Sequence, residues 1–182
     1  MEGNNQNNAK RGRSLLEWYE ALVFAVIILV IAFSFAFRII EVQGISMEPT
    51  LQNEDRLLVW GAGYTPADGD VVVLDGYIDF GKPLVKRIIA TSGQTVDIDF
   101  ASGDVTVDGQ VLEESYIADR TSVSGDITFP LTVPEGKVFV MGDNRNHSTD
   151  SRFSTVGCID ERDVLGRVVF RITPLSKAGV IE

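Results

Sequence analysis

The chain has 182 residues, 45% of them hydrophobic, so it is long enough and apolar enough to bury the core of one modest domain. Its net charge is −10, and because residues 1–37 carry three basic and three acidic side chains, the whole acidic excess lies in residues 38–182. That excess argues against nucleic acid as a partner, since phosphate binding requires a basic surface, and the single cysteine, Cys158, excludes an internal disulfide.

An uncharged and almost wholly apolar run of 17 residues extends from Ala21 to Phe37. As a helix it would span about 25 Å, slightly less than the ~30 Å core of a bilayer, and Ile39 and Ile40 extend the apolar stretch if Arg38 snorkels. Basic residues precede the run, which places the N-terminus in the cytoplasm. We therefore expect a cytoplasmic tail over residues 1–20, disordered in its Asn- and Gln-rich part at 3–9, a transmembrane anchor over residues 21–40, and an extracytoplasmic domain over residues 41–182.

Two other interpretations of the apolar run are open. The first is a core helix of a globular protein. Such a helix usually has one polar face toward solvent, and this run has none. A cleaved signal peptide, with a small-residue site at residues 32–34, usually has an apolar segment of ~7–15 residues, and this run is longer. Both observations favour an anchor that stays attached to the chain.

Beyond Arg38 the sequence has no long helical period, and short β-branched runs alternate with turn signals instead. The dipeptide Asp108-Gly109 is a strong signal for a two-residue hairpin. Strands this short and frequent predict a mostly β fold, either a short-stranded β-sandwich or a partly open barrel. The expected strands are residues 56–60, 70–74, 84–90, 95–100, 105–107, 110–112, 127–133, 137–141 and 164–172.

Ser46, nine residues after Phe37, is a candidate nucleophile, and a serine hydroxyl needs a base within hydrogen-bond reach. Lys86 lies among apolar neighbours, and strand alternation puts it on one face with Leu84 and Ile88. Burial on that face would lower the pKa of its amine, so that a neutral Lys86 could accept the Ser46 proton. The alternative is an exposed lysine at a strand edge, and the local sequence alone favours that interpretation.

His147, the only histidine, is the rival candidate base, because Ser-His-Asp is a familiar catalytic triad. It lies in a polar loop beside Asn146 and Ser148, where a histidine exposed on the surface is the more common finding. A serine hydrolase with His147 as its base therefore stays an alternative hypothesis.

Four segments resemble, in order, the motif boxes of type I signal peptidases, the Ser-Lys family of membrane serine proteases. The stretch from Ser46 to Leu51 resembles the nucleophile box, and Lys86-Arg87 resembles the general-base box. The segments at 69–73 and 141–152 resemble two further boxes, the second being the most characteristic. The small size and the single N-terminal anchor resemble the compact Gram-positive form of the family.

The resemblance implies a role for each matching residue. Ser46 would attack the scissile carbonyl, and Lys86 would act as general base and then as the acid for the leaving amine. His147 falls on a variable position, which favours a surface histidine. The supporting residues would be Ser148, which orients the lysine amine, the pair Asp150 and Arg152, which holds the loop, the bracing residues Asp143, Asn144 and Arg145, and Met47, which lines the site.

Gly44 is a departure from the pattern of some family members, which carry a serine hydroxyl at this position to help bind the oxyanion. An oxyanion hole in this chain would depend on backbone N–H groups at Ser46 and Gly44, or on water. Gly44 would also give the turn its freedom to adopt a positive φ.

The function implied by the resemblance is removal of signal peptides from secreted preproteins, with cleavage after small residues at −3 and −1. An extended substrate could pair as an added strand with the β domain. The expected partners are signal peptides and the lipid bilayer, and no metal or cofactor is expected. A non-catalytic, membrane-tethered peptide-binding module is the alternative from a different functional class.

Overall fold

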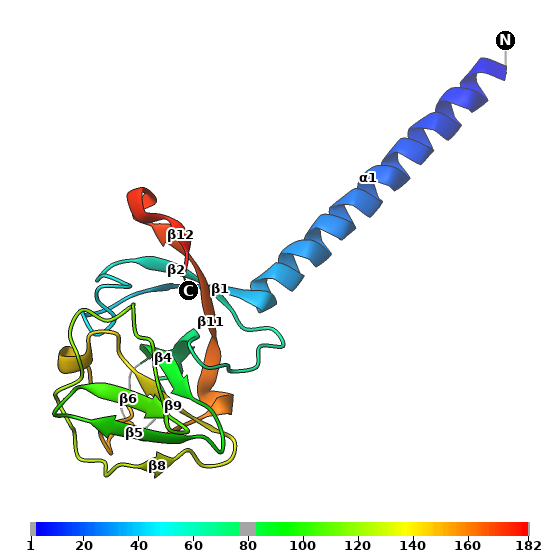
Figure 1. Cartoon of the computed structure of the whole chain (residues 1–182). Coiled ribbons are helices and arrows are strands. Elements are labelled where there is room, and N and C mark those ends of the chain that lie inside the picture. The colour runs from blue at the N-terminus through cyan, green and yellow to red at the C-terminus, as the bar shows by residue number, and fades with distance from the viewer. Residues whose placement is uncertain (1–2, 77–82, 182) are drawn as a thin grey trace. The chain divides into compact units, whose positions relative to one another are not determined.

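The computed structural model describes residues 3–76 and 83–181, and the chain divides into two compact units, Met1–Phe37 and Arg38–Glu182. The first unit is the uninterrupted helix α1 (Gly3–Ala36), visible in Figure 1. Its segment Leu16–Ala36, 21 residues long, is sufficiently long and apolar to cross a membrane by length and composition.

The limits of α1 differ from the expectation at both ends. Residues 3–9 are helical rather than disordered, because each residue added to an existing helix gains a backbone hydrogen bond, and Asn and Gln lack the steric penalty of proline. At the other end α1 stops at Ala36, and Phe37–Glu41 forms strand β1, so the last residues of the range 21–40 are extended.

The second unit contains an eight-stranded sheet in the order β1-β2-β11-β3-β4-β9-β10, with β12 paired to β11. β3 and β4 lie inside this sheet and are mostly buried on both faces, which explains why their sequences are nearly continuous apolar runs. The strands are β1 (Phe37–Glu41), β2 (Arg56–Trp60), β3 (Val71–Leu74), β4 (Leu84–Ala90), β9 (Lys137–Met141), β10 (Ile159–Asp160), β11 (Val164–Thr173) and β12 (Gly179–Val180).

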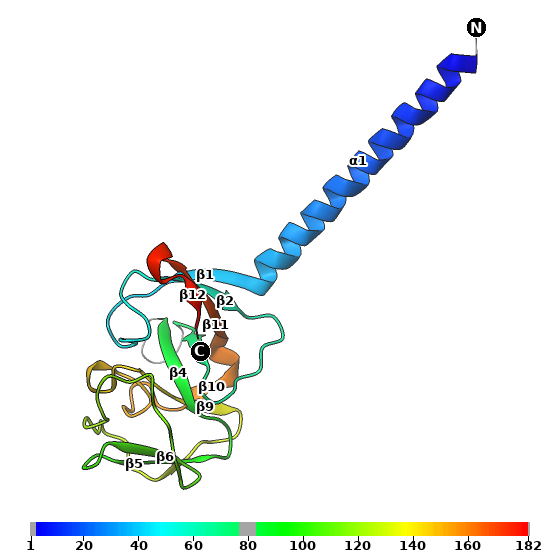
Figure 2. The ribbon, with the colours of Figure 1, turned by 45° about the horizontal axis from the view of Figure 1, so that its top comes forward.

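A smaller sheet has the order β7-β6-β5-β8. The hairpin between β6 and β7 turns at Asp108 and Gly109, with φ of 51° and 78°, and pairs Val107 with Gln110. Two positive φ values in a two-residue loop are typical of a type I′ turn, so the predicted hairpin is confirmed. Figures 1 and 2 show β5 and β6 at one end of this unit and β1, β2 and β12 at the other. The strands are β5 (Thr95–Asp99), β6 (Asp104–Val107), β7 (Gln110–Val111) and β8 (Leu131–Thr132).

The mostly β prediction is confirmed, and the larger differences have local causes. Only Leu131–Thr132 is strand within the expected 127–133, and Pro130 has no N–H to donate to a ladder. Strands β10 and β12 have two residues each, too few to show an alternating pattern. Within the described residues there are also three short 3₁₀ helices: η1 (Arg145–His147), η2 (Glu161–Asp163) and η3 (Leu175–Lys177).

One buried cluster fixes the segment that carries Ser46. Met47 and Leu51 are 1% and 0% exposed, and the Leu51 N–H donates to the Met47 carbonyl at 2.8 Å. Burying each of these side chains contributes about 1.5–3 kcal/mol, so the turn after Ser46 is anchored to the sheet. The cluster comprises Val42, Met47, Leu51, Leu57, Val59, Val71, Val73, Val168 and Ile181.

Candidate active site

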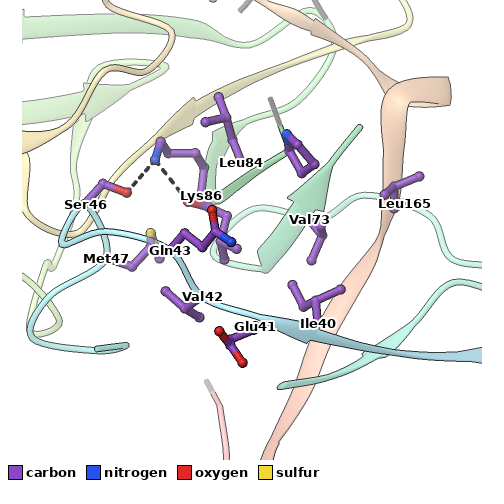
Figure 3. A pocket seen from close by; sticks show the side chains of 12 residues that line it. Ile40, Glu41, Val42, Gln43, Ser46, Met47, Val73, Leu84, Lys86 and Leu165 are labelled. Carbon is purple, nitrogen blue, oxygen red and sulfur yellow. Dashed lines mark hydrogen bonds between the residues drawn. The ribbon is translucent and has the colours of Figure 1, made fainter. Parts of the chain in front are cut away.

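Ser46 and Lys86, from different parts of the chain, meet in the second unit. The Lys86 Nζ donates a hydrogen bond to the Ser46 Oγ at 2.7 Å and another to the Val85 carbonyl at 3.1 Å (Figure 3). This separation is within the reach that a serine needs from its base. If the amine loses its proton, the same contact lets the Ser46 hydroxyl donate to Nζ.

The surroundings of Lys86 make its amine easier to deprotonate than that of an exposed lysine. Its side chain is 2% exposed, and burial lowers its pKa from 10.5 to about 8, although the charges of Asp150 and Asp143 act in the opposite direction. Strand β4 is hydrogen-bonded to β3 on one side and β9 on the other. The alternative of an exposed lysine at a strand edge is therefore wrong.

The two backbone N–H groups expected to bind the oxyanion, those of Gly44 and Ser46, have different surroundings. Gly44 has a φ of +94°, as the sequence predicted, but its N–H donates to the Asn53 Oδ1 at 2.8 Å. The Ser46 N–H donates to no group within residues 3–76 and 83–181. Of the two, only the Ser46 N–H is free to bind an oxyanion.

Asn144 and Gly142 hold the Ser46 backbone from the facing loop. The Asn144 backbone N–H donates to the Ser46 carbonyl, and its Nδ2 donates to the Ile45 carbonyl, both at 3.0 Å. A Cβ placed on Gly142 would lie 2.4 Å from the Ser46 carbonyl oxygen and 2.3 Å from the Ser148 Oγ. Only glycine allows the loop to approach this closely.

Asp143 joins the strand of Lys86 to the segment of Ser46. Its carboxylate accepts two hydrogen bonds from the buried Arg87, at 2.9 and 2.8 Å, and one from the Thr50 Oγ1 at 2.5 Å. The residue was expected to brace its own turn, whereas the hydrogen bonds of its carboxylate in the described residues connect the loop to two other segments.

Arg145 and Arg152 hold the rest of this loop. Arg145 donates to the Gly142 carbonyl at 3.2 Å and forms an ion pair with Glu114 at 2.5 Å. Arg152 and Asp150, both fully buried, are joined by two hydrogen bonds of 2.8 and 2.9 Å. Asp150 also accepts from the Gly142 N–H at 3.0 Å, so this pair braces the loop in the expected manner.

The expected hydrogen bond between Ser148 and Lys86 is not formed. The Ser148 Oγ is buried and has no hydrogen-bond partner in the part of the chain that the structure describes. The hydrogen bonds of the Lys86 amine go to Ser46 and Val85. Ser148 instead packs against Gly142, where its hydroxyl lines the space that a Cβ would fill.

His147 has no contact that would make it a base for Ser46. It is the last residue of η1, its side chain is exposed, and it is not among the residues that line the pocket around Ser46. The observed partner of the Ser46 hydroxyl is Lys86, so the geometry does not favour the alternative with His147 as base.

Several residues of this network were not assigned by the sequence. The guanidinium of Arg87 lies 4.0 Å from the centre of the Tyr116 ring. Thr50 binds Asp143, and Glu114 binds Arg145. The two consecutive cations in this apolar strand could have indicated a buried ion pair, because a permanent positive charge inside a sheet requires a carboxylate partner. The identity of that partner could not be found from the sequence.

A pocket of about 610 Å³ opens beside Ser46 and Lys86, a size typical of ligand sites. Figure 3 shows Gln43 and Met47 beside the pair and Ile40 and Val73 farther along the wall. Apolar side chains form most of this wall. The described residues that line it are Ile40, Glu41, Val42, Gln43, Ser46, Met47, Val73, Pro83, Leu84, Val85, Lys86 and Leu165.

Comparisons with known proteins agree on one family. Residues 15–173 match the family model described as signal peptidase, peptidase S26. A signal peptidase I of Bacillus licheniformis is 33% identical over 94% of this chain and 96% of its own length. A probable signal peptidase I-1 of Synechocystis sp. is 37% identical over 88% of this chain and 85% of its own. The crystal structure of a signal peptidase I from Enterococcus faecalis V583 is 28% identical, with a TM-score of 0.50, and covers 58% of this chain and 98% of that one.

Proposed function

Because this chain belongs to the signal peptidase family, peptidase S26, we propose that it is a membrane-anchored serine endopeptidase that removes signal peptides from exported preproteins. Ser46 is the nucleophile and Lys86 the general base. The observation that carries the proposal is the 2.7 Å hydrogen bond between the Lys86 Nζ and the Ser46 Oγ beside a pocket with a mostly apolar wall.

In the first step the neutral Lys86 amine accepts the hydroxyl proton of Ser46 while the Oγ attacks the scissile carbonyl carbon. The carbonyl oxygen becomes an oxyanion, and the free N–H of Ser46 donates a hydrogen bond to it. A pKa of about 8 leaves part of the Lys86 population neutral at pH 7, which is what a lysine base requires.

In the second step the Lys86 ammonium donates its proton to the nitrogen of the leaving amine, and the C–N bond breaks. The mature protein departs with a new N-terminus, and the signal peptide stays bound to Ser46 as an ester. Lys86 then takes a proton from a water molecule, whose oxygen attacks the ester carbonyl. The C–O bond to Ser46 breaks as the Lys86 ammonium returns the proton to the Ser46 Oγ, and the signal peptide leaves with a free carboxyl group.

The substrate lies as an extended strand along the pocket, between the segment 40–43 and strand β4. Apolar residues such as Val42, Met47 and Leu84 line this path, and they suit the small side chains at −3 and −1 of a signal peptide. Hydrogen bonds along the backbone would hold any extended sequence, so the side-chain pockets provide the selectivity.

The candidate span Leu16–Ala36 anchors the enzyme, with the N-terminus in the cytoplasm and the β domain on the opposite side. Ser46 follows the end of this span by ten residues, which reach at most ~35 Å when fully extended. The anchor therefore keeps the nucleophile near the bilayer surface at which signal peptides end.

The test uses the full chain in detergent and a preprotein with alanine at −3 and −1. We expect a single cut at the end of the signal peptide, identified by the mass of the product, and no cut when the alanine at −1 is replaced by phenylalanine. The Ser46→Ala variant is expected to bind the preprotein without cutting it.

Two results would contradict the proposal. Binding without any cleavage by the wild-type chain would support the non-catalytic peptide-binding module instead. Cleavage at the wild-type rate by the Ser46→Ala variant would show that another residue is the nucleophile.

A further inference from the structure

The side chain of Asn144 contacts the peptide unit that contains the Ser46 N–H. Its Nδ2 donates to the Ile45 carbonyl at 3.0 Å, and its backbone N–H donates to the Ser46 carbonyl at the same distance. Asn144 thus binds the carbonyl groups of Ile45 and Ser46, and within the described residues it forms no hydrogen bond to the Ser46 Oγ or the Lys86 amine.

A peptide unit is planar, and in its trans form the carbonyl and the N–H point in opposite directions. The Ile45–Ser46 bond is trans, since the cis bonds of the described chain all precede proline. Because Asn144 holds the Ile45 carbonyl, the Ser46 N–H points away from Asn144, and it donates to no group in residues 3–76 and 83–181.

The segment before Ser46 needs such a restraint. Gly44 has a φ of +94° and no side chain, and a Cβ placed there would have no neighbour within 4 Å, so no side-chain packing at this position restrains the peptide that follows it. The Glu48 N–H also donates to the Ile45 carbonyl, at 3.1 Å, but this bond lies within the same turn and moves with it. Asn144 connects the turn to the loop held by Asp143 and Arg87.

From these contacts we infer that Asn144 is a positioning residue that directs the Ser46 N–H toward the oxyanion. The inference rests on the proposed function and adds to it a residue that acts only through the Ser46 peptide. Since this chain has glycine at position 44 and its N–H is taken by Asn53, the Ser46 N–H is the donor whose direction matters most.

The test compares Asn144→Ala and Asn144→Asp with the matched control Asn146→Ala in preprotein cleavage. Asn146 lies two residues farther along the same loop. Its side chain hydrogen-bonds to Ser122, Val123 and the Arg120 carbonyl, and within the described residues it forms no hydrogen bond to the Ser46 segment. Losing a complete oxyanion donor lowers kcat by about 10²–10³-fold, and a misdirected donor retains part of its effect. We expect kcat to fall about 10- to 100-fold in both Asn144 variants, with KM within about 3-fold of wild type.

The pH profile separates positioning from a general disturbance. The midpoint of kcat/KM stays at the wild-type pH in Asn144→Ala, which adds no charge near Lys86, and Asn146→Ala keeps kcat within about 3-fold. Equal losses in Asn144→Ala and Asn146→Ala, a shifted midpoint in Asn144→Ala, or wild-type kcat in Asn144→Asp would each overturn the inference. An inactive wild-type chain would instead contradict the proposed function.

Discussion

At the scale of single residues, the site depends on a lysine in a place where lysines are unfavourable. A side chain that is 2% exposed inside a sheet loses hydration, and its charged form is disfavoured. Lys86 keeps two hydrogen bonds there, to Ser46 and to Val85. The same burial that destabilises the ammonium increases the neutral fraction of the amine, which the proposed mechanism requires.

The pH dependence of kcat/KM follows from this burial. Only the neutral Lys86 can accept the Ser46 proton, and burial lowers its pKa to about 8, so activity rises with pH through a midpoint near 8. The measurement is preprotein cleavage at subsaturating substrate between pH 6 and 10. A midpoint near 6.5 would point to a histidine base, and one near 10.4 to an exposed lysine.

The residues that the sequence predicted best are those whose role is local. The positive φ of Gly44 follows from the absence of a Cβ, and Ser46 and Lys86 lie in short segments that resemble the family's boxes. The expected bond from Ser148 to Lys86 is absent, because its formation depends on side-chain packing against Gly142 that no local pattern encodes.

At the scale of elements, the loop between β9 and β10 determines how the Ser46 segment meets strand β4. Asp143 binds Arg87 of β4 on one side and Thr50 of the Ser46 segment on the other. Arg145 and Arg152 extend the connection to residues 114–123, through Glu114 and the Val123 carbonyl. Breaking any of these buried ion pairs would leave an unpaired buried charge, which is strongly unfavourable. The contacts therefore hold the loop in one arrangement.

The closest approach between these elements occurs at Gly142, and the Gly142→Ala substitution tests its importance. The added methyl group would lie 2.4 Å from the Ser46 carbonyl oxygen and 2.3 Å from the Ser148 Oγ, so the Ser46 segment must move. Displacing a nucleophile by about 1 Å costs ~10²-fold in rate, and overpacking costs about 1–3 kcal/mol of stability. We expect kcat/KM for preprotein cleavage to fall about 100-fold and thermal unfolding to occur at a lower temperature.

Gly179→Ala is the matched control, because a Cβ at that position has no neighbour within 4 Å. It is expected to retain wild-type activity and stability. Normal cleavage by Gly142→Ala would mean that the loop does not set the position of Ser46.

The elements that the sequence did not predict have a common cause. Strand β1 could not be distinguished from the end of the apolar run, because one continuous stretch of hydrophobic residues forms first the helix and then the strand. The carboxylate partners of Arg87 and Arg145 lie 56 and 31 positions away in the sequence, and only the folded domain brings them together. Composition and alternation predicted the fold class because those signals act within each strand.

At the scale of the whole molecule, the two units carry separate parts of the proposed function. Helix α1 supplies the candidate span, and the β unit supplies the pocket, the Ser46–Lys86 contact and its supporting loop. The acidic excess lies entirely outside the first 37 residues, so the part that would anchor the enzyme carries no net charge.

The most direct test of the central claim is the kcat/KM of preprotein cleavage by Ser46→Ala, Lys86→Ala and the double variant. If the two residues act as one catalytic unit, each single variant loses at least ~10³-fold, and the double variant is no slower than either. A Lys86→Ala enzyme that retains activity within about 10-fold of wild type, or losses that multiply in the double variant, would contradict the Ser46–Lys86 mechanism.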